Sequence, residues 1–172
     1  MHIVLVEPEI PGNTGNIARL CAATGCQLHL VKPLGFSVED RYLKRAGLDY
    51  WHLVDVYYYD SIEEVLERFK SHKIFMLTTK AHRAYTEATY DEDSVLVFGK
   101  ESAGLPQQLL ENHHEECIRI PMIASARSLN LSNAVAVVVY EGLRQQNAFG
   151  LERDGRIAWH LRGRAAEAEA IE

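Results

Sequence analysis

The 172-residue sequence has few features of exported, membrane-bound or metal-binding proteins. No basic stretch precedes the first apolar residues, so no secretory signal is expected, and no apolar run approaches the roughly 20 residues that span a bilayer. The three cysteines, Cys21, Cys26 and Cys117, are odd in number and have the spacing of neither a zinc site nor a redox pair. We therefore expect reduced cysteines in the core, no bound metal and a cytoplasmic protein.

Two glycine signatures of nucleotide-binding proteins are also missing. No G-x-G-x-x-G follows the first apolar run, and no G-x-x-x-x-G-K-[ST] occurs anywhere. Their absence disfavours a dinucleotide site and a P-loop. The net charge of −6 argues against a protein that coats nucleic acid through bulk charge, although it leaves room for a local basic site.

The sequence does contain enough apolar residues for one ordinary core, with 47% hydrophobic and 24% charged residues. Short apolar runs predict strands over residues 2–7, 27–31, 51–58, 73–78, 94–98 and 116–120. Helical patterns lie between or after them, from residue 13 or 14 to 24 and over 38–46, 61–71, 107–111 and 130–145. This alternation predicts an α/β fold with a mostly parallel sheet and helices on both faces. Residues 1–149 should form a single domain, and residues 150–172 a charged, poorly packed C-terminal extension.

Three unusual loops follow predicted strands, over residues 8–16, 99–106 and 121–133. Ligands of open α/β sheets bind beyond the carboxyl ends of the strands, so we expect these loops to form one site. Gly99 and Gly104 would allow close backbone approach or a positive φ. Glu101 between them could accept hydrogen bonds from ligand hydroxyls, attract a cation or simply be solvated.

The segment over residues 118–141 is the most informative. Four small polar residues surround a predicted helix start, where they can cap the helix and can offer a nucleoside its donors and acceptors: Ser128, Asn130, Ser132 and Asn133. Residues 134–139 are apolar on all sides, which predicts a helix that is buried all round.

Four segments together resemble the SPOUT superfamily of RNA methyltransferases. They read EPEIPGNTGNIAR over residues 7–19, RAGLDY over 45–50, FGKESAGLP over 98–106, and IPM over 120–122 followed by RSLNLSN over 127–133. The likeness is best to the tRNA (cytidine/uridine-2′-O)-methyltransferase branch, the TrmL or YibK type, and covers nearly all of residues 3–146. It implies a C-terminal trefoil knot, which general folding rules would not predict. It also implies S-adenosylmethionine as methyl donor, with S-adenosylhomocysteine as product, and a homodimer that acts on tRNA.

The resemblance also implies roles for individual residues. Cofactor contacts are expected from Leu77, Gly99, Ile120 and Ser128, and in second rank from Gly104, Met122, Leu129 and Asn133. Catalytic roles are expected for Arg19, Asn16, Tyr140 and Lys80, and Arg127 is a candidate for RNA contact. Independently of the resemblance, Arg41, Lys44 and Arg45 form one basic face of a predicted helix, which is either solvated or contacts RNA phosphates. Because arginine stays protonated in proteins, we expect Arg19 to position a phosphate and the ribose, with Asn16 beside it, rather than to act as a base.

The expected reaction is methylation of the ribose 2′-hydroxyl of wobble nucleotide 34, a cytidine or modified uridine, with leucine tRNAs as the implied substrates. This nucleotide lies in a single-stranded loop, where its base can be splayed out. Three alternatives stay open. They are 2′-O-methylation at another tRNA or ribosomal RNA position, a non-catalytic RNA-binding module of the same fold, and a dinucleotide-dependent oxidoreductase.

Overall fold

A six-stranded parallel sheet forms the centre of the protein, whose computed structural model describes residues 1–37, 53–148, 150–152 and 154. The strand order is β3-β2-β1-β5-β4-β6, and every neighbouring pair is parallel. The strands are β1 (His2–Val6), β2 (Gln27–Val31), β3 (Val56–Tyr59), β4 (Ile74–Leu77), β5 (Val95–Phe98) and β6 (Cys117–Ile118). The predicted fold class is confirmed.

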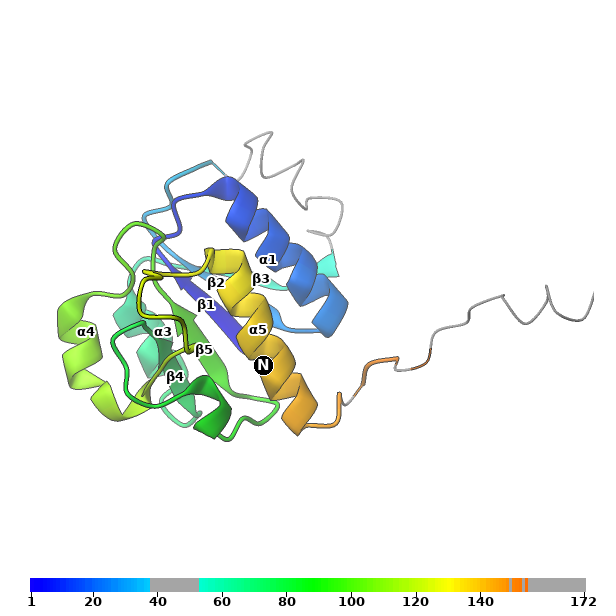
Figure 1. Ribbon diagram of the computed structural model, residues 1–172. Coiled ribbons are helices and arrows are strands. Elements are labelled where there is room, and N and C mark those ends of the chain that lie inside the picture. Colours follow the sequence, from blue (N-terminus) through cyan, green and yellow to red (C-terminus); the bar gives the residue numbers. More distant parts are fainter. Residues whose placement is uncertain (38–52, 149, 153, 155–172) are drawn as a thin grey trace, which may run out of the picture.

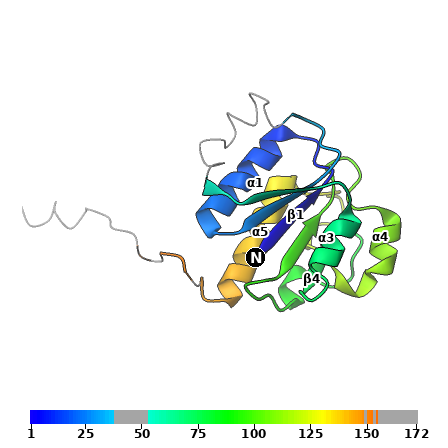
Figure 2. The same ribbon diagram turned by 180° about the vertical axis from the view of Figure 1, so that it is seen from behind.

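Helices cover both faces of the sheet (Figures 1 and 2). The pair α1 (Pro11–Thr24) and α5 (Leu131–Gln145) lies on one face, and α3 (Ile62–Arg68) and α4 (Gln107–Asn112) lie on the other. Successive side chains of a strand point to opposite faces, so β1 supplies Ile3 and Leu5 to the first core and Val4 and Val6 to the second. Burial on both faces explains why the strands appear in the sequence as continuous apolar runs.

Local sequence accounts for the helix ends. Helix α1 starts at Pro11, earlier than predicted, because a proline suits the first helical position, where no N–H partner is needed. It ends at Gly25, which adopts the left-handed conformation with φ 71°. Helix α3 begins at the predicted cap, where the Ser61 hydroxyl accepts from the Glu64 amide at 3.4 Å. It ends at Arg68, short of the predicted end.

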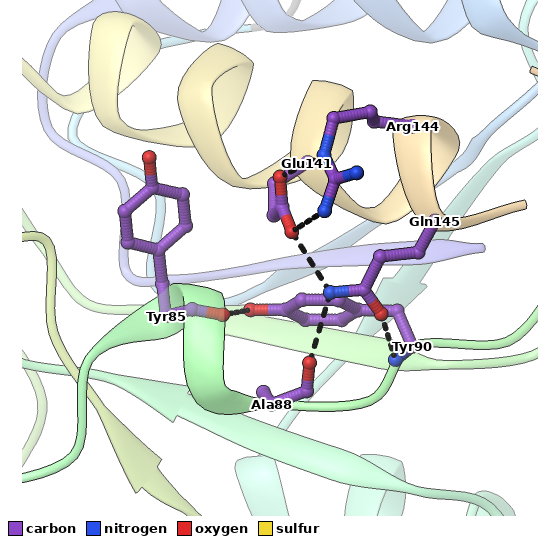
Figure 3. A network of polar contacts seen from close by, with 6 residues as sticks. All are labelled: Tyr85, Ala88, Tyr90, Glu141, Arg144 and Gln145. Carbon is purple, nitrogen blue, oxygen red and sulfur yellow. Dashed lines mark hydrogen bonds and ion pairs between the residues drawn. The ribbon is translucent and has the colours of Figure 1, made fainter. Parts of the chain in front are cut away.

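Both ends of α5 are held by side chains. At its start, the Asn130 side-chain oxygen accepts from the Ser132 amide at 3.0 Å. At its end, the Gln145 amide nitrogen donates to the Ala88 carbonyl at 3.0 Å, and its oxygen accepts from the Tyr90 amide at 3.0 Å (Figure 3). These bonds join the last turn of α5 to the connection between β4 and β5.

The outer stripe of α5 is exposed, and the prediction that this helix is buried all round is wrong for the single chain. Val135, Val138 and Val139 are buried, whereas Val137 is 37% exposed and Tyr140 is 54% exposed. The reason is geometric: one face of the helix packs on the sheet and on α1, and the chain supplies nothing that covers the opposite face among the residues described. An exposed apolar stripe of this kind is typical of an interaction surface.

The cysteines are as the sequence predicts, whereas other expected segments differ or lie outside the described residues. The three cysteines are free and buried, as predicted. Strand β3 begins at Val56, later than expected, and the predicted helix over 38–46 lies outside the described residues. Most of the predicted extension over 150–172 also lies outside them. The trefoil knot stays a prediction. Within the described part of the chain, no helix is both long and apolar enough to cross a bilayer.

Candidate functional site

The three predicted loops meet around one cavity of about 640 Å³, referred to below as the loop cavity. It lies beyond the carboxyl ends of β4 and β5, and its volume falls in the range of about 300–1,000 Å³ that is usual for small-ligand sites. Seven of the eight predicted cofactor contacts line it: Leu77, Gly99, Gly104, Ile120, Met122, Ser128 and Leu129. The eighth, Asn133, does not.

Two glycines shape the wall that the middle loop contributes. A Cβ atom on Gly99 would lie 2.1 Å from the carbonyl carbon of Gly104, so no larger residue fits there. Gly104 has a φ of 71°, which favours glycine, and its amide donates to the Lys100 carbonyl at 2.8 Å. The positive φ is confirmed at Gly104, whereas Gly99 is needed for close packing against the Gly104 backbone, and close approach of a ligand stays a prediction.

Glu101 connects the middle loop to the first loop. Its carboxylate accepts from the Glu9 amide at 2.8 Å, from the Ile10 amide at 3.2 Å and from the Asn13 side-chain amide at 2.8 Å. The residue that caps α1, Ile10, has no side chain able to accept a hydrogen bond. Glu101 therefore brings its charge to the start of α1, where the helix dipole favours an anion. Sequence reasoning left Glu101 as a ligand contact or a solvated acid and missed this role.

Asn13 extends the connection to the third loop. Its side-chain oxygen accepts from the Asn130 side-chain amide at 2.9 Å, and the Asn130 oxygen caps α5. The chain Glu101–Asn13–Asn130, called the amide chain below, thus joins all three loops beside the cavity. The only sequence signal for it is indirect: α1 begins at Ile10-Pro11, which provides no local cap, so a distant acceptor is needed.

Carboxylates at the end of β1 and in the first loop also hold the middle loop. Lys100 pairs with Glu7 at 2.7 Å, which raises the pKa of the lysine. Glu9 accepts from the Ser102 hydroxyl at 2.7 Å and from its amide at 2.9 Å, and these bonds lower the pKa of the Glu9 carboxyl. Three successive residues of the middle loop, Lys100, Glu101 and Ser102, are therefore bonded to the segment that follows β1.

The predicted catalytic and RNA-contacting residues that the structure describes fall into two groups. Lys80 and Arg127 line the loop cavity, and the Lys80 ammonium donates to the Gln107 side chain at 2.7 Å. Arg19 and Asn16 are exposed on α1 and Tyr140 is exposed on α5, and none of the three lines the cavity. The remaining three, Arg41, Lys44 and Arg45, lie outside the described residues. One chain alone does not bring the two groups together.

The residues present suit an S-adenosylmethionine molecule. Leu77, Phe98 and Ile120 offer apolar surface for an adenine, and backbone groups of the middle loop at Gly99 and Gly104 line the same cavity. Among the residues that the structure describes, no three His, Cys, Asp or Glu side chains cluster in a way that could hold a metal ion.

Comparison with known proteins agrees with this geometry. Residues 1–140 match the SpoU rRNA Methylase family. The tRNA (cytidine(34)-2'-O)-methyltransferase of Yersinia pestis is 50% identical over 151 residues, which span 84% of this chain and 93% of that protein. A solved structure described as "Structural insights into the 2-OH methylation of C/U34 on tRNA" is 44% identical, with a TM-score of 0.81, and covers 85% of this chain and 95% of its own.

A cofactor-bound structure is also similar. The AdoMet-bound rRNA methyltransferase from Sinorhizobium meliloti is 25% identical, with a TM-score of 0.73, over 83% of this chain and 55% of that one. The family match extends over most of the chain, and the Yersinia pestis relative is similar over nearly its whole length. The chain belongs to the SpoU rRNA methylase family.

Proposed function

We propose that this protein transfers a methyl group from S-adenosylmethionine to the ribose 2′-hydroxyl of nucleotide 34 of tRNA, in the cytoplasm, with leucine tRNAs as substrates. The observation that carries the proposal is the loop cavity, which collects seven of the eight predicted cofactor contacts at the carboxyl ends of the strands. The names of two similar proteins, which specify nucleotide 34, support the choice of substrate.

The chain has to align the two reactants and assist loss of the hydroxyl proton. The bound cofactor supplies a methyl group that is already electrophilic, whereas a protonated 2′-hydroxyl is a poor nucleophile. Lys80 and Arg127 lie at the loop cavity and bring two cations to it. We assign them to the phosphates that flank the target ribose, because contacts to phosphate fix the position of a nucleotide without reading its base. Holding the ribose in line with the methyl group is worth several orders of magnitude in rate.

Arg19 and Tyr140 require a second copy of the chain in this proposal. Both are exposed and lie away from the cavity of their own chain, on the neighbouring helices α1 and α5. The exposed Val137 and Tyr140 give the same face an apolar centre. We propose that two protomers pack through this face, so that Arg19 of one protomer holds the phosphate and ribose at the cavity of its partner. The planar guanidinium group of arginine has five N–H donors in a fixed arrangement, which suits binding of a phosphate.

Methyl transfer to defined RNAs tests the proposal. The full chain is incubated with labelled S-adenosylmethionine and with leucine tRNA transcripts that carry either C34 or U34, and the methylated nucleotide is mapped. Ribosomal RNA and a leucine tRNA whose nucleotide 34 already carries a 2′-O-methyl group are the controls. Label on nucleotide 34 alone supports the proposal. Label elsewhere in tRNA, or on ribosomal RNA, indicates another target, and tRNA binding without transfer indicates a binding module.

Arg19→Lys provides a second test, of the positioning role. Lysine keeps the charge and loses the planar fork, so we expect slower transfer with unchanged S-adenosylhomocysteine binding. A variant with wild-type turnover would show that bidentate positioning by Arg19 is not needed.

A further inference from the structure

Two large apolar side chains stand exposed at the rim of the loop cavity. Ile10 of the first loop is 48% exposed and Leu129 of the third loop is 42% exposed, and both line the cavity. Deeper in the cavity, Phe98, Leu105 and Leu110 are buried. The cavity therefore has an apolar floor and a separate apolar rim, called the Ile10/Leu129 rim below.

The rim is held in place by backbone contacts rather than by burial of its side chains. The Ile10 amide donates to Glu101 at 3.2 Å, and its carbonyl accepts from the Asn13 amide at 3.0 Å. Leu129 directly precedes Asn130, whose side chain donates to Asn13 at 2.9 Å. Both rim residues thus adjoin the amide chain. Fixed apolar groups at the mouth of a site can bind with a small loss of conformational entropy.

The exposed surface of the rim does not suit the cofactor, although Leu129 is itself one of the expected cofactor contacts. The adenine of S-adenosylmethionine finds apolar surface in the interior of the cavity, and the charged sulfonium and amino acid parts gain nothing from isoleucine or leucine at a wet edge. The second substrate must also enter through the mouth, because its 2′-hydroxyl has to reach the methyl group. The base of that same nucleotide is attached to the adjacent ribose carbon, so it must lie close to the mouth as well.

We propose that the Ile10/Leu129 rim holds the base of the target nucleotide by contact with its flat apolar faces. The inference rests on the proposed function and adds how the site recognises its base. A base that is flipped out for chemistry is held between aromatic or apolar side chains, and isoleucine and leucine are of the second kind. Such contact buries the half-exposed rim residues, and it leaves the hydrogen-bonding edge of the base unread.

This mode of binding predicts tolerance between pyrimidines. Apolar pockets discriminate weakly between ligands of similar shape, whereas a site that hydrogen-bonds one polar group rejects its analogue by several orders of magnitude. Cytosine and uracil have the same ring shape and differ in the groups on their edge. A rim made of isoleucine and leucine should therefore accept both, and the choice of tRNA must come from contacts elsewhere on the molecule.

The test separates base contact from the other roles of the rim. Ile10→Ala and Leu129→Ala are compared with Ile123→Ala, which removes an apolar side chain that is 75% exposed and does not line the cavity. For each full-length variant saturated with S-adenosylhomocysteine, the Kd is measured for three tRNAs that carry C34, U34 or an abasic nucleotide 34. The value of kcat/KM on the C34 and U34 substrates, the Kd for S-adenosylhomocysteine and the oligomeric state in solution are also measured.

Ile10→Ala should raise the Kd for C34 tRNA and for U34 tRNA by the same factor, about fivefold to tenfold. This is the loss expected when roughly half an isoleucine side chain is no longer buried. Binding of the abasic tRNA, binding of S-adenosylhomocysteine and the oligomeric state should stay within about twofold of wild type, as should every value for Ile123→Ala. Leu129→Ala should behave like Ile10→Ala toward the three tRNAs.

Four results would overturn the inference. An equal penalty on the abasic tRNA means that the rim does not touch the base, and a penalty on C34 alone means that the base edge is read. Loss of S-adenosylhomocysteine binding in Ile10→Ala assigns the rim to the cofactor, and dissociation into monomers assigns it to a second copy of the chain. If wild-type protein methylates nucleotide 34 and one of these results appears, only the inference fails. If it methylates none of the three tRNAs, the proposed function fails as well.

Discussion

Replacement of Glu101 by glutamine should distort the loop cavity and weaken ligand binding there without abolishing it. In the structure one carboxylate oxygen accepts from the Glu9 amide at 2.8 Å, and the other accepts from the Ile10 amide at 3.2 Å and the Asn13 side chain at 2.8 Å. Glutamine keeps one acceptor oxygen and replaces the other with a donor. At least one N–H group of the first loop then faces an NH₂ group.

The expected loss follows from these contacts. A hydrogen bond to a charged group contributes about 1.5–3 kcal/mol, and Glu101 is only half-buried, so we expect the free energy of unfolding to fall by about 2 kcal/mol. For a chain of this size, such a loss lowers Tm by about 4–8 °C. Because the same bonds hold the first and middle loops together at the cavity, the Kd for S-adenosylhomocysteine should rise by about tenfold.

Thermal unfolding and calorimetric titration with S-adenosylhomocysteine measure the two effects. Ser102→Ala is the matched control on the same loop, since it removes one exposed hydrogen bond to Glu9 and should cost less than about 1 kcal/mol. If Glu101→Gln unfolds and binds S-adenosylhomocysteine as wild type does, the amide chain does not shape the site, and the reasoning from its geometry is refuted.

Three further predictions concern other parts of the protein. Gly99→Ala should abolish S-adenosylhomocysteine binding, because its Cβ would lie 2.1 Å from a backbone carbon, and titration calorimetry at high protein concentration would detect any binding that survives. Burial lowers the pKa of His29 to about 3 and that of His2 to about 4, and the two rings hydrogen-bond at 3.1 Å. The unfolded chain therefore takes up protons between pH 6.5 and these values while the folded chain does not. Stability should be full above about pH 6.5 and fall below it by up to about 1.4 kcal/mol per pH unit for each histidine, and urea unfolding at several pH values that showed no such fall would contradict this. Val137→Glu places a charge on the exposed stripe of α5, so sedimentation should show monomers. These monomers should fold and bind S-adenosylhomocysteine but should not transfer methyl groups. An intact dimer would place the interface elsewhere.

Local sequence patterns were sufficient to predict the strands and most helices. The strands are buried on both faces, so they appear as uninterrupted apolar runs, and Ser61 and Gly25 mark helix ends by chemistry that needs no distant partner. Parallel strands place their carboxyl ends at one edge, which is why three loops far apart in the chain could be assigned to one site. These parts of the fold depend on neighbours in sequence or on topology alone.

Long-range partners explain what the sequence could not reveal. Glu101 bonds to residues 88–92 positions away, and Asn13 bonds to Asn130 across 117 positions, so no local pattern records either contact. The prediction for the exposed stripe of α5 was wrong because an apolar helix face is expected to be buried, but composition does not show whether the same chain or a partner buries it. Tyr140, predicted to be catalytic, lies on the exposed face of the same helix, and its catalytic role stays a prediction.

Mapping of the methylated nucleotide tests the proposed function most directly. Wild-type protein, labelled S-adenosylmethionine and a C34 leucine tRNA should give label on the 2′-oxygen of nucleotide 34, and a Gly99→Ala protein assayed beside it should give none. Label at any other nucleotide, or tRNA binding without label, would contradict the assignment of this cavity to methyl transfer at the wobble position.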